Sequence, residues 1–175
     1  MKRTILVTFC LLFALSVAIY GFNYIQLQSK INSVVKADPR NEGIKVTVHF
    51  GTYVNPLKLI YNLKSVSATN SMADVFRVFL QFAEKMSSKD FKEVVLAYKG
   101  RAKFKIDGAY FQKLGKEYSW QNPVYTMRTF PENLKNLDGA QAYGQWTGGL
   151  FGVLKEQMED FNDFHRKWYF NDMPK

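Results

Sequence analysis

Cysteine is almost absent from this chain of 175 residues, and the only one is Cys10. Cys10 lies inside an uncharged apolar run, so the rest of the chain has no thiol for a disulfide or a thiolate metal site. Histidine is also scarce, with only His49 and His165. The sequence therefore predicts no metal site and no cofactor. It leaves the compartment open, because domains on either side of a membrane can lack disulfides.

Catalytic and nucleotide-binding motifs are missing as well. Residues 144–152 hold four glycines, but they fit neither G-x-G-x-x-G nor G-x-x-x-x-G-K-[ST]. We interpret that stretch as a hinge or tight passage. No Ser-His-Asp or Cys-His set can be assembled from the sequence. A role without catalysis is therefore favoured, although enzymatic activity is not excluded.

The overall composition is that of a folded protein with a basic excess. Hydrophobic residues make up 47% of the chain, charged residues 22% and aromatic residues 16%, which supports a substantial core and excludes a disordered chain. The formal net charge is +9, and Lys2 and Arg3 account for two of these charges, which leaves +7 on the rest. Such an excess favours an acidic partner and says nothing about the fold.

The first residues form the strongest pattern. Lys2 and Arg3 precede a stretch without charge that runs to residue 29, and residues 5–25 are broken only by Thr8, Ser16, Gly21 and Asn23. As a helix, this run is about 30 Å long, which matches the hydrocarbon core of a bilayer. Aromatic residues at its end suit the headgroup zone. The run predicts a single-pass membrane contact through residues 5–25.

The flanking charges predict the orientation of this segment. A basic pair before the run places the N-terminus in the cytoplasm and the following domain outside it. A cleaved signal is the alternative, because Ser16-Val17-Ala18 offers small residues for a signal peptidase and would give a secreted protein. The anchor is favoured, since the run is long for a signal peptide. A buried core helix is disfavoured, because the run has no polar face.

The remaining chain predicts one α+β domain. We divide the sequence into an anchor or signal segment (1–29), a linker (30–42) and a single domain (43–175). The alternation of apolar residues predicts strands at 44–50, 91–98 and 102–106, the last two joined as a hairpin. Helices are expected at 71–86, with a capping box at Ser71 and Asp74, and at 109–118 and 150–170. Residues 57–63 are ambiguous. Residues 121–130 are expected to be extended or irregular because of Pro123 and Pro131, with a further strand possible there. The expected architecture is a small antiparallel sheet with helices on one face and a long C-terminal helix.

Three clusters are candidate sites. The first is Asp160, Asp163 and His165, whose carboxylates share a helix face and would hold a cation in a metal-assisted hydrolase. Because Arg166 and Lys167 follow and His165 falls on the apolar stripe, a solvated face with a core histidine is the favoured interpretation.

The second cluster is a basic hairpin. Arg101, Lys103 and Lys105 point outward together and would suit phosphate, lipid headgroups or an acidic polymer. No aromatic residue lies between them for base stacking, so nucleic acid is disfavoured as a partner. A solvated strand face protected from edge aggregation is the simpler interpretation.

The third cluster is an aromatic and polar stretch at 118–131, with Trp120, Asn122, Tyr125 and Arg128 as candidate binding residues. Its composition is typical of a recognition surface, and the alternative is an ordered loop whose aromatic side chains fill the core. The leading hypothesis is a membrane-anchored extracytoplasmic binding or assembly module with a protein or acidic partner. The oligomeric state is not fixed by the sequence.

Overall fold

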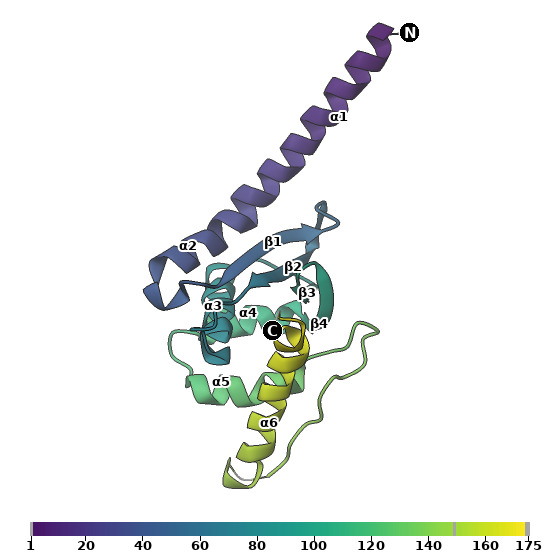
Figure 1. Cartoon of the computed structure of the whole chain (residues 1–175). Coiled ribbons are helices and arrows are strands. Elements are labelled where there is room, and N and C mark those ends of the chain that lie inside the picture. The colour runs from purple at the N-terminus through teal and green to yellow at the C-terminus, as the bar shows by residue number, and fades with distance from the viewer. Residues whose placement is uncertain (1, 149, 174–175) are drawn as a thin grey trace.

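The computed structural model describes residues 2–148 and 150–173. It shows a long N-terminal helix beside a four-stranded sheet, with further helices packed on the sheet (Figure 1). The predicted α+β class is confirmed.

The N-terminal helix continues from α1 (Lys2–Asn23) through a π-helical turn, η1 (Tyr24–Gln28), into α2 (Ser29–Ala37). The helical stretch from Thr4 to Ala37 is long and apolar enough to cross a membrane, and its apolar window contributes nothing to the core. In Figure 1 α1 projects away from the rest of the chain. The side chains of Ile5, Phe9 and Leu11 are mostly exposed, as expected for a helix whose natural surroundings are apolar.

The sheet has the order β1-β2-β3-β4. Strands β1 (Lys45–Gly51) and β2 (Asn55–Ser65) form one antiparallel hairpin, and β3 (Glu93–Tyr98) and β4 (Arg101–Asp107) form the other. Strands β2 and β3 pair in parallel, so the sheet is mixed and not purely antiparallel as expected. The parallel pairing arises because α3 (Met72–Lys85) is a crossover helix between β2 and β3. It carries the chain back to the edge of the sheet where β2 begins, so β3 starts beside β2 and runs in the same direction. The ambiguous residues 57–63 belong to β2.

Local signals placed α3 correctly. The Ser71 hydroxyl accepts a hydrogen bond from the Asp74 amide at 3.2 Å, and the Asp74 carboxylate accepts one from the Ser71 amide at 2.8 Å, which confirms the capping box. Helix α3 packs with α4 (Gly108–Glu117) and α6 (Leu150–Trp168) over one face of the sheet. The buried rings in this layer include Phe76, Phe79, Phe111, Phe130 and Phe164.

The sequence prediction for residues 121–130 is wrong. It forms a helix, α5 (Pro123–Thr129), followed by the 3-10 turn η3 (Pro131–Asn133). Asn122 caps α5 by accepting a hydrogen bond from the Val124 amide at 2.9 Å, and Pro123 takes the first helical position, where its missing N–H costs nothing. The two prolines restrict only the residues that precede them, so the six residues 124–129 remain free to be helical.

Residues 30–42 pack against the domain. Ile31 and Val34 of α2 are fully or almost fully buried, together with Leu27 of η1. The short turn η2 (Pro39–Asn41) then buries Asn41 completely. A third 3-10 turn, η4 (Phe170–Asp172), is the last element of the described chain. The juxtamembrane residues are therefore part of the folded body.

Two side-chain amides join the N-terminal helix to the open edge of β1. Asn23 accepts a hydrogen bond from the Phe50 amide at 2.8 Å and donates one to the Tyr53 carbonyl at 2.8 Å. Gln28 accepts from the Val48 amide at 2.9 Å and donates to the Val46 carbonyl at 3.2 Å. Each amide presents the acceptor and donor that a neighbouring strand would present, so the helix closes an edge that would otherwise invite pairing with another chain.

We expect Asn23→Leu to destabilise the protein by about 1–3 kcal/mol, because the buried Phe50 amide loses its acceptor. The Phe50 amide should also lose protection in hydrogen exchange measured on full-length protein in detergent micelles. Ser33→Ala is the control, since that hydroxyl bonds only within its own helix. Unchanged protection at Phe50 would contradict this account of the edge.

Candidate binding site

An apolar cavity of about 300 Å³ opens between α3, α4 and α5. Its apolar lining comes from Phe76 and Leu80 of α3, Leu114 of α4 and Met127 of α5. Gly115 of α4 allows α3 and α4 to pack closely. A Cβ at this position would collide with the carbonyl of Ala83 in α3. The close packing of α3 and α4 forms one wall, and α5 forms the other.

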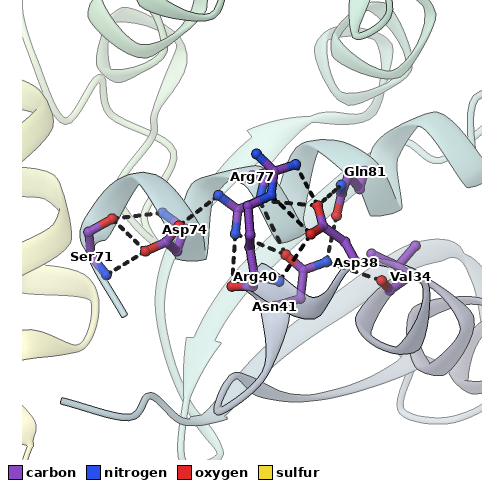
Figure 2. A network of polar contacts seen from close by, with 8 residues as sticks. All are labelled: Val34, Asp38, Arg40, Asn41, Ser71, Asp74, Arg77 and Gln81. Carbon is purple, nitrogen blue, oxygen red and sulfur yellow. Dashed lines mark hydrogen bonds and ion pairs between the residues drawn. The ribbon is translucent and has the colours of Figure 1, made fainter. Parts of the chain in front are cut away.

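Two arginines at the mouth of the cavity are held by carboxylates (Figure 2). Arg77 donates to Asp74 at 2.6 Å, and Arg40 pairs with Asp38 at 2.7 Å. The Arg40 guanidinium holds the pKa of Asp38 well below its usual range. Burial works against the charged form of Asp74, but hydrogen bonds from Ser71 and Arg77 outweigh it and lower its pKa. Both carboxylates are therefore charged at neutral pH, and they offset the two guanidinium charges at the mouth.

The same network ties the juxtamembrane segment to the wall of the cavity. Buried Asn41 donates to Gln81 of α3 at 2.7 Å and to the Val34 carbonyl at 3.1 Å, and its oxygen accepts from Arg77 at 3.2 Å. Figure 2 shows these contacts crossing from the turn after α2 to α3. The cavity is thus held in a fixed position relative to the N-terminal helix.

Of the four predicted recognition residues, Trp120 and Tyr125 present exposed aromatic side chains beside this cavity. Trp120 is 67% exposed, and Tyr125 lies one turn into α5 with nearly half of its surface accessible. Val124 between them is also exposed. We call Trp120, Val124 and Tyr125 the corner patch, since they surround the junction of α4 and α5. Gln121, Pro123 and Thr126 of the same segment line the cavity, so the patch and the cavity form one continuous surface.

The other two residues position this patch. Asn122 caps α5, as described above. The Arg128 guanidinium lies 5.0 Å from the centre of the Tyr125 ring and donates to Gln157 of α6 at 2.7 Å. Arg128 therefore fixes Tyr125 and joins α5 to α6, and both of its contacts are internal.

The cavity itself had no signal in the sequence. Phe76 and Leu114 lie in segments correctly expected to be helical, but the cavity beside them also needs α5, which forms its other wall. Ala73 is the residue most informative in retrospect. It is small and exposed, and it lines the cavity in a helix whose neighbouring positions carry bulky residues.

The basic hairpin residues are largely engaged within the protein. Lys103 pairs with Asp172 at 2.7 Å, and Lys105 pairs with Glu93 at 3.1 Å. Glu93 also contacts Lys58 of β2 at 2.6 Å, while Arg101 is exposed at the start of β4. The row offers less free positive charge than the sequence alone implies.

The structure points the three residues of the first candidate cluster in different directions. Asp160 accepts a hydrogen bond from the Trp146 ring at 2.8 Å, and Asp163 accepts from Lys167 and Tyr143. His165 is fully buried among aromatic rings, with neither ring nitrogen hydrogen-bonded. No group of three His, Cys, Asp or Glu side chains that could hold a metal ion occurs among the described residues.

The chain matches no family model, no curated protein and no solved structure. The function is therefore inferred from the geometry of the chain's own surfaces. The cavity and the corner patch are the features of the described residues that best fit a ligand, because apolar lining and exposed aromatic side chains occur together there.

Burial lowers the pKa of His165 to about 3, from the ordinary value of 6.5. Between these values the unfolded chain binds a proton that the folded chain does not. The free energy of unfolding should therefore fall as the pH falls below about 6.5, by up to about 1.4 kcal/mol per pH unit from this residue. His165→Leu should remove that component and keep full stability at pH 7. Denaturant melts from pH 7 to pH 4 would test this, and parallel slopes for the two proteins would refute it.

Proposed function

We propose that this protein is a single-pass, membrane-anchored binding module whose domain lies outside the cytoplasm. The N-terminal helix supports the anchor, because it is apolar, exposed and long enough to cross a bilayer. Lys2 and Arg3 before it support a cytoplasmic N-terminus. The helix continues into the domain and is bonded to the edge of β1, as expected for an element that holds the domain on the membrane.

The site of binding is the cavity together with the corner patch, and we propose that its ligand is a segment of polypeptide. A volume of about 300 Å³ accommodates a few apolar side chains, which act as anchors in protein interfaces. Exposed Trp and Tyr beside such a pocket are typical of interface hot spots. The neutral mouth gives no preference for an acidic ligand.

The position of the site also favours a protein over a lipid. From Tyr24 to Ala37 the helix advances about 20 Å along its axis, and η2 at the cavity mouth lies beyond that point. Figure 1 places α5 on the side of the domain away from α1. Acyl chains of the membrane that holds α1 are therefore out of reach of the cavity.

Filling the cavity should abolish binding. We expect Ala73→Trp to lower crosslinking of a photoreactive residue at position 125 about tenfold or more in native membranes, because a bulky ring would occupy the space for the partner's anchor. Ala109→Trp is the matched control, since Ala109 is an exposed alanine near the start of α4 that does not line the cavity.

The readout is the set of discrete protein adducts on the full-length chain, identified by mass spectrometry. Both variants should keep the melting temperature of the parent protein, because both alanines are exposed. Equal adduct yields from Ala73→Trp and Ala109→Trp would exclude the cavity as the binding site.

The anchor has its own test. Full-length protein should remain in the membrane pellet after alkaline carbonate extraction, since residues 5–25 carry no charge and form a run long enough to span the hydrocarbon core. Protease added to the extracytoplasmic side should digest the domain and leave the N-terminus protected. Unprocessed protein in the soluble fraction without detergent would refute the anchor.

A further inference from the structure

The hairpin that joins β1 to β2 points back along the N-terminal helix. As the chain runs from Val46 in β1 to Tyr53 in the turn that follows, its partners on the helix run in the opposite direction, from Gln28 to Asn23. The tip of the hairpin therefore lies at the end of α1 that adjoins the domain, and Figure 1 shows it beside that helix. The tip is fixed there, because the Asn23 amide bonds to the strand on both of its polar atoms.

The depth of this tip follows from the helix. From Ile5 to Asn23 the helix advances about 27 Å, close to the thickness of the hydrocarbon core. A helix inserted from Ile5 onward places Asn23, and the hairpin tip bonded to it, at the boundary between the acyl chains and the headgroups. Tyr20 and Tyr24 on the helix lie at the same level and are exposed.

The side chains at the tip suit that boundary. Val54 is 62% exposed and Tyr53 is 48% exposed, so both side chains present apolar surface to the surroundings of the domain. Tyr53 stacks on His49 with ring centres 4.1 Å apart, so its ring is held in place. Aromatic residues of this amphipathic kind are enriched in the headgroup zone of bilayers.

The turn itself gives a second indication. Thr52 and Tyr53 both have positive φ, 48° and 64°, and the Val54 amide bonds to the Gly51 carbonyl at 3.1 Å. Hairpin turns of this kind strongly prefer Asn and Gly at these two positions. A β-branched and an aromatic residue there cost conformational energy, and such strain is retained where the exposed side chains have a use.

A cavity of about 430 Å³ lies beside the tip, between the helix and the open face of the sheet. Three tyrosines line it, Tyr20, Tyr24 and Tyr53, and Lys64 lies on its wall. The remaining lining is polar, from Asn23, Gln28, Thr47, His49 and Asn62 with one apolar residue, Val48. Phenol rings, amides and a lysine side chain are groups that contact lipid headgroups. With α1 inserted in a bilayer, the cavity would lie at the level of the headgroups.

We propose that the tip Tyr53-Val54 enters the headgroup zone of the leaflet nearest the domain, and that lipid headgroups fill the adjoining cavity. This inference rests on the proposed membrane anchor. The domain then touches the bilayer at two points, α1 and the hairpin tip, which fixes its orientation and keeps the corner patch turned away from the membrane.

The test uses fluorophores on single cysteines of the full-length chain in nanodiscs of phosphatidylcholine and phosphatidylglycerol. An environment-sensitive dye is placed at Val54→Cys in a Cys10→Ser background. Val124→Cys is the matched control, because Val124 is also an exposed valine, at 53%, but belongs to the corner patch. The dye at position 54 should emit at shorter wavelength and be quenched severalfold less by aqueous iodide than the dye at position 124. Lipids spin-labelled at the headgroup should quench position 54 and not position 124.

A charged residue in the tip sharpens the test. Tyr53→Asp should raise the iodide quenching of the dye at position 54 toward the value at position 124, because a carboxylate resists transfer out of water. The inference is overturned if positions 54 and 124 are equally accessible to iodide in the parent chain.

The native cysteine separates this inference from the anchor. Cys10 is exposed on α1, and in the otherwise unaltered chain a dye on it should be quenched by lipids spin-labelled deep in the acyl chain. Quenching at Cys10 with an aqueous position 54 would refute the hairpin contact alone. An aqueous Cys10 would refute the anchor, and the hairpin contact with it.

Discussion

The bonding of Asn23 and Gln28 to the outer edge of β1 is the constraint on which the rest of the molecule depends. An edge strand carries a row of unpaired amides and carbonyls, and four of these groups are satisfied by two side chains of the N-terminal helix. The contact is directional, unlike apolar packing, so it sets both the distance and the register of the helix on the sheet. A helix that merely preceded the domain would leave its orientation free.

That register is carried through the domain by a second set of polar contacts. After Gln28, the helix buries Ile31 and Val34 and reaches Asn41, whose amide bonds to Val34, Gln81 and Arg77. Arg77 is also a wall residue of the cavity. The chain of contacts from the edge of β1 to the cavity contains no flexible linker, so the proposed binding site stands at a fixed place relative to the helix. This suits a module that has to present a surface to a partner at a set distance from a membrane.

The parts of the fold that follow local rules could be predicted from the sequence, and the parts that depend on distant partners could not. The alternation at 44–50, the Ser71 capping box and the 93–107 hairpin need only neighbouring residues, and all three are confirmed. The parallel pairing of β2 with β3 depends on recognising α3 as a crossover. Asn23 stood out in the sequence only as an interruption of an apolar run, since its strand partners lie 27 and 30 residues away. For the same reason, the composition of residues 118–131 was enough to predict Trp120 and Tyr125 as binding residues. The cavity beside them could not be predicted, because it depends on the position of α5 in the fold.

Two groups of exposed aromatic side chains in the domain, at the hairpin tip and at the corner patch, lie in different surroundings. Tyr53 lies at the level of Asn23, where α1 ends, and its neighbours around the adjoining cavity are tyrosines and polar residues. Trp120 and Tyr125 lie beside the apolar cavity between α3, α4 and α5, which Arg40 of η2 also lines. Under the proposed membrane anchor, an amphipathic ring would gain from the headgroup zone in the first group and from another protein surface in the second. The residue type alone does not distinguish these two proposed roles, whereas the position of each ring relative to the N-terminal helix does.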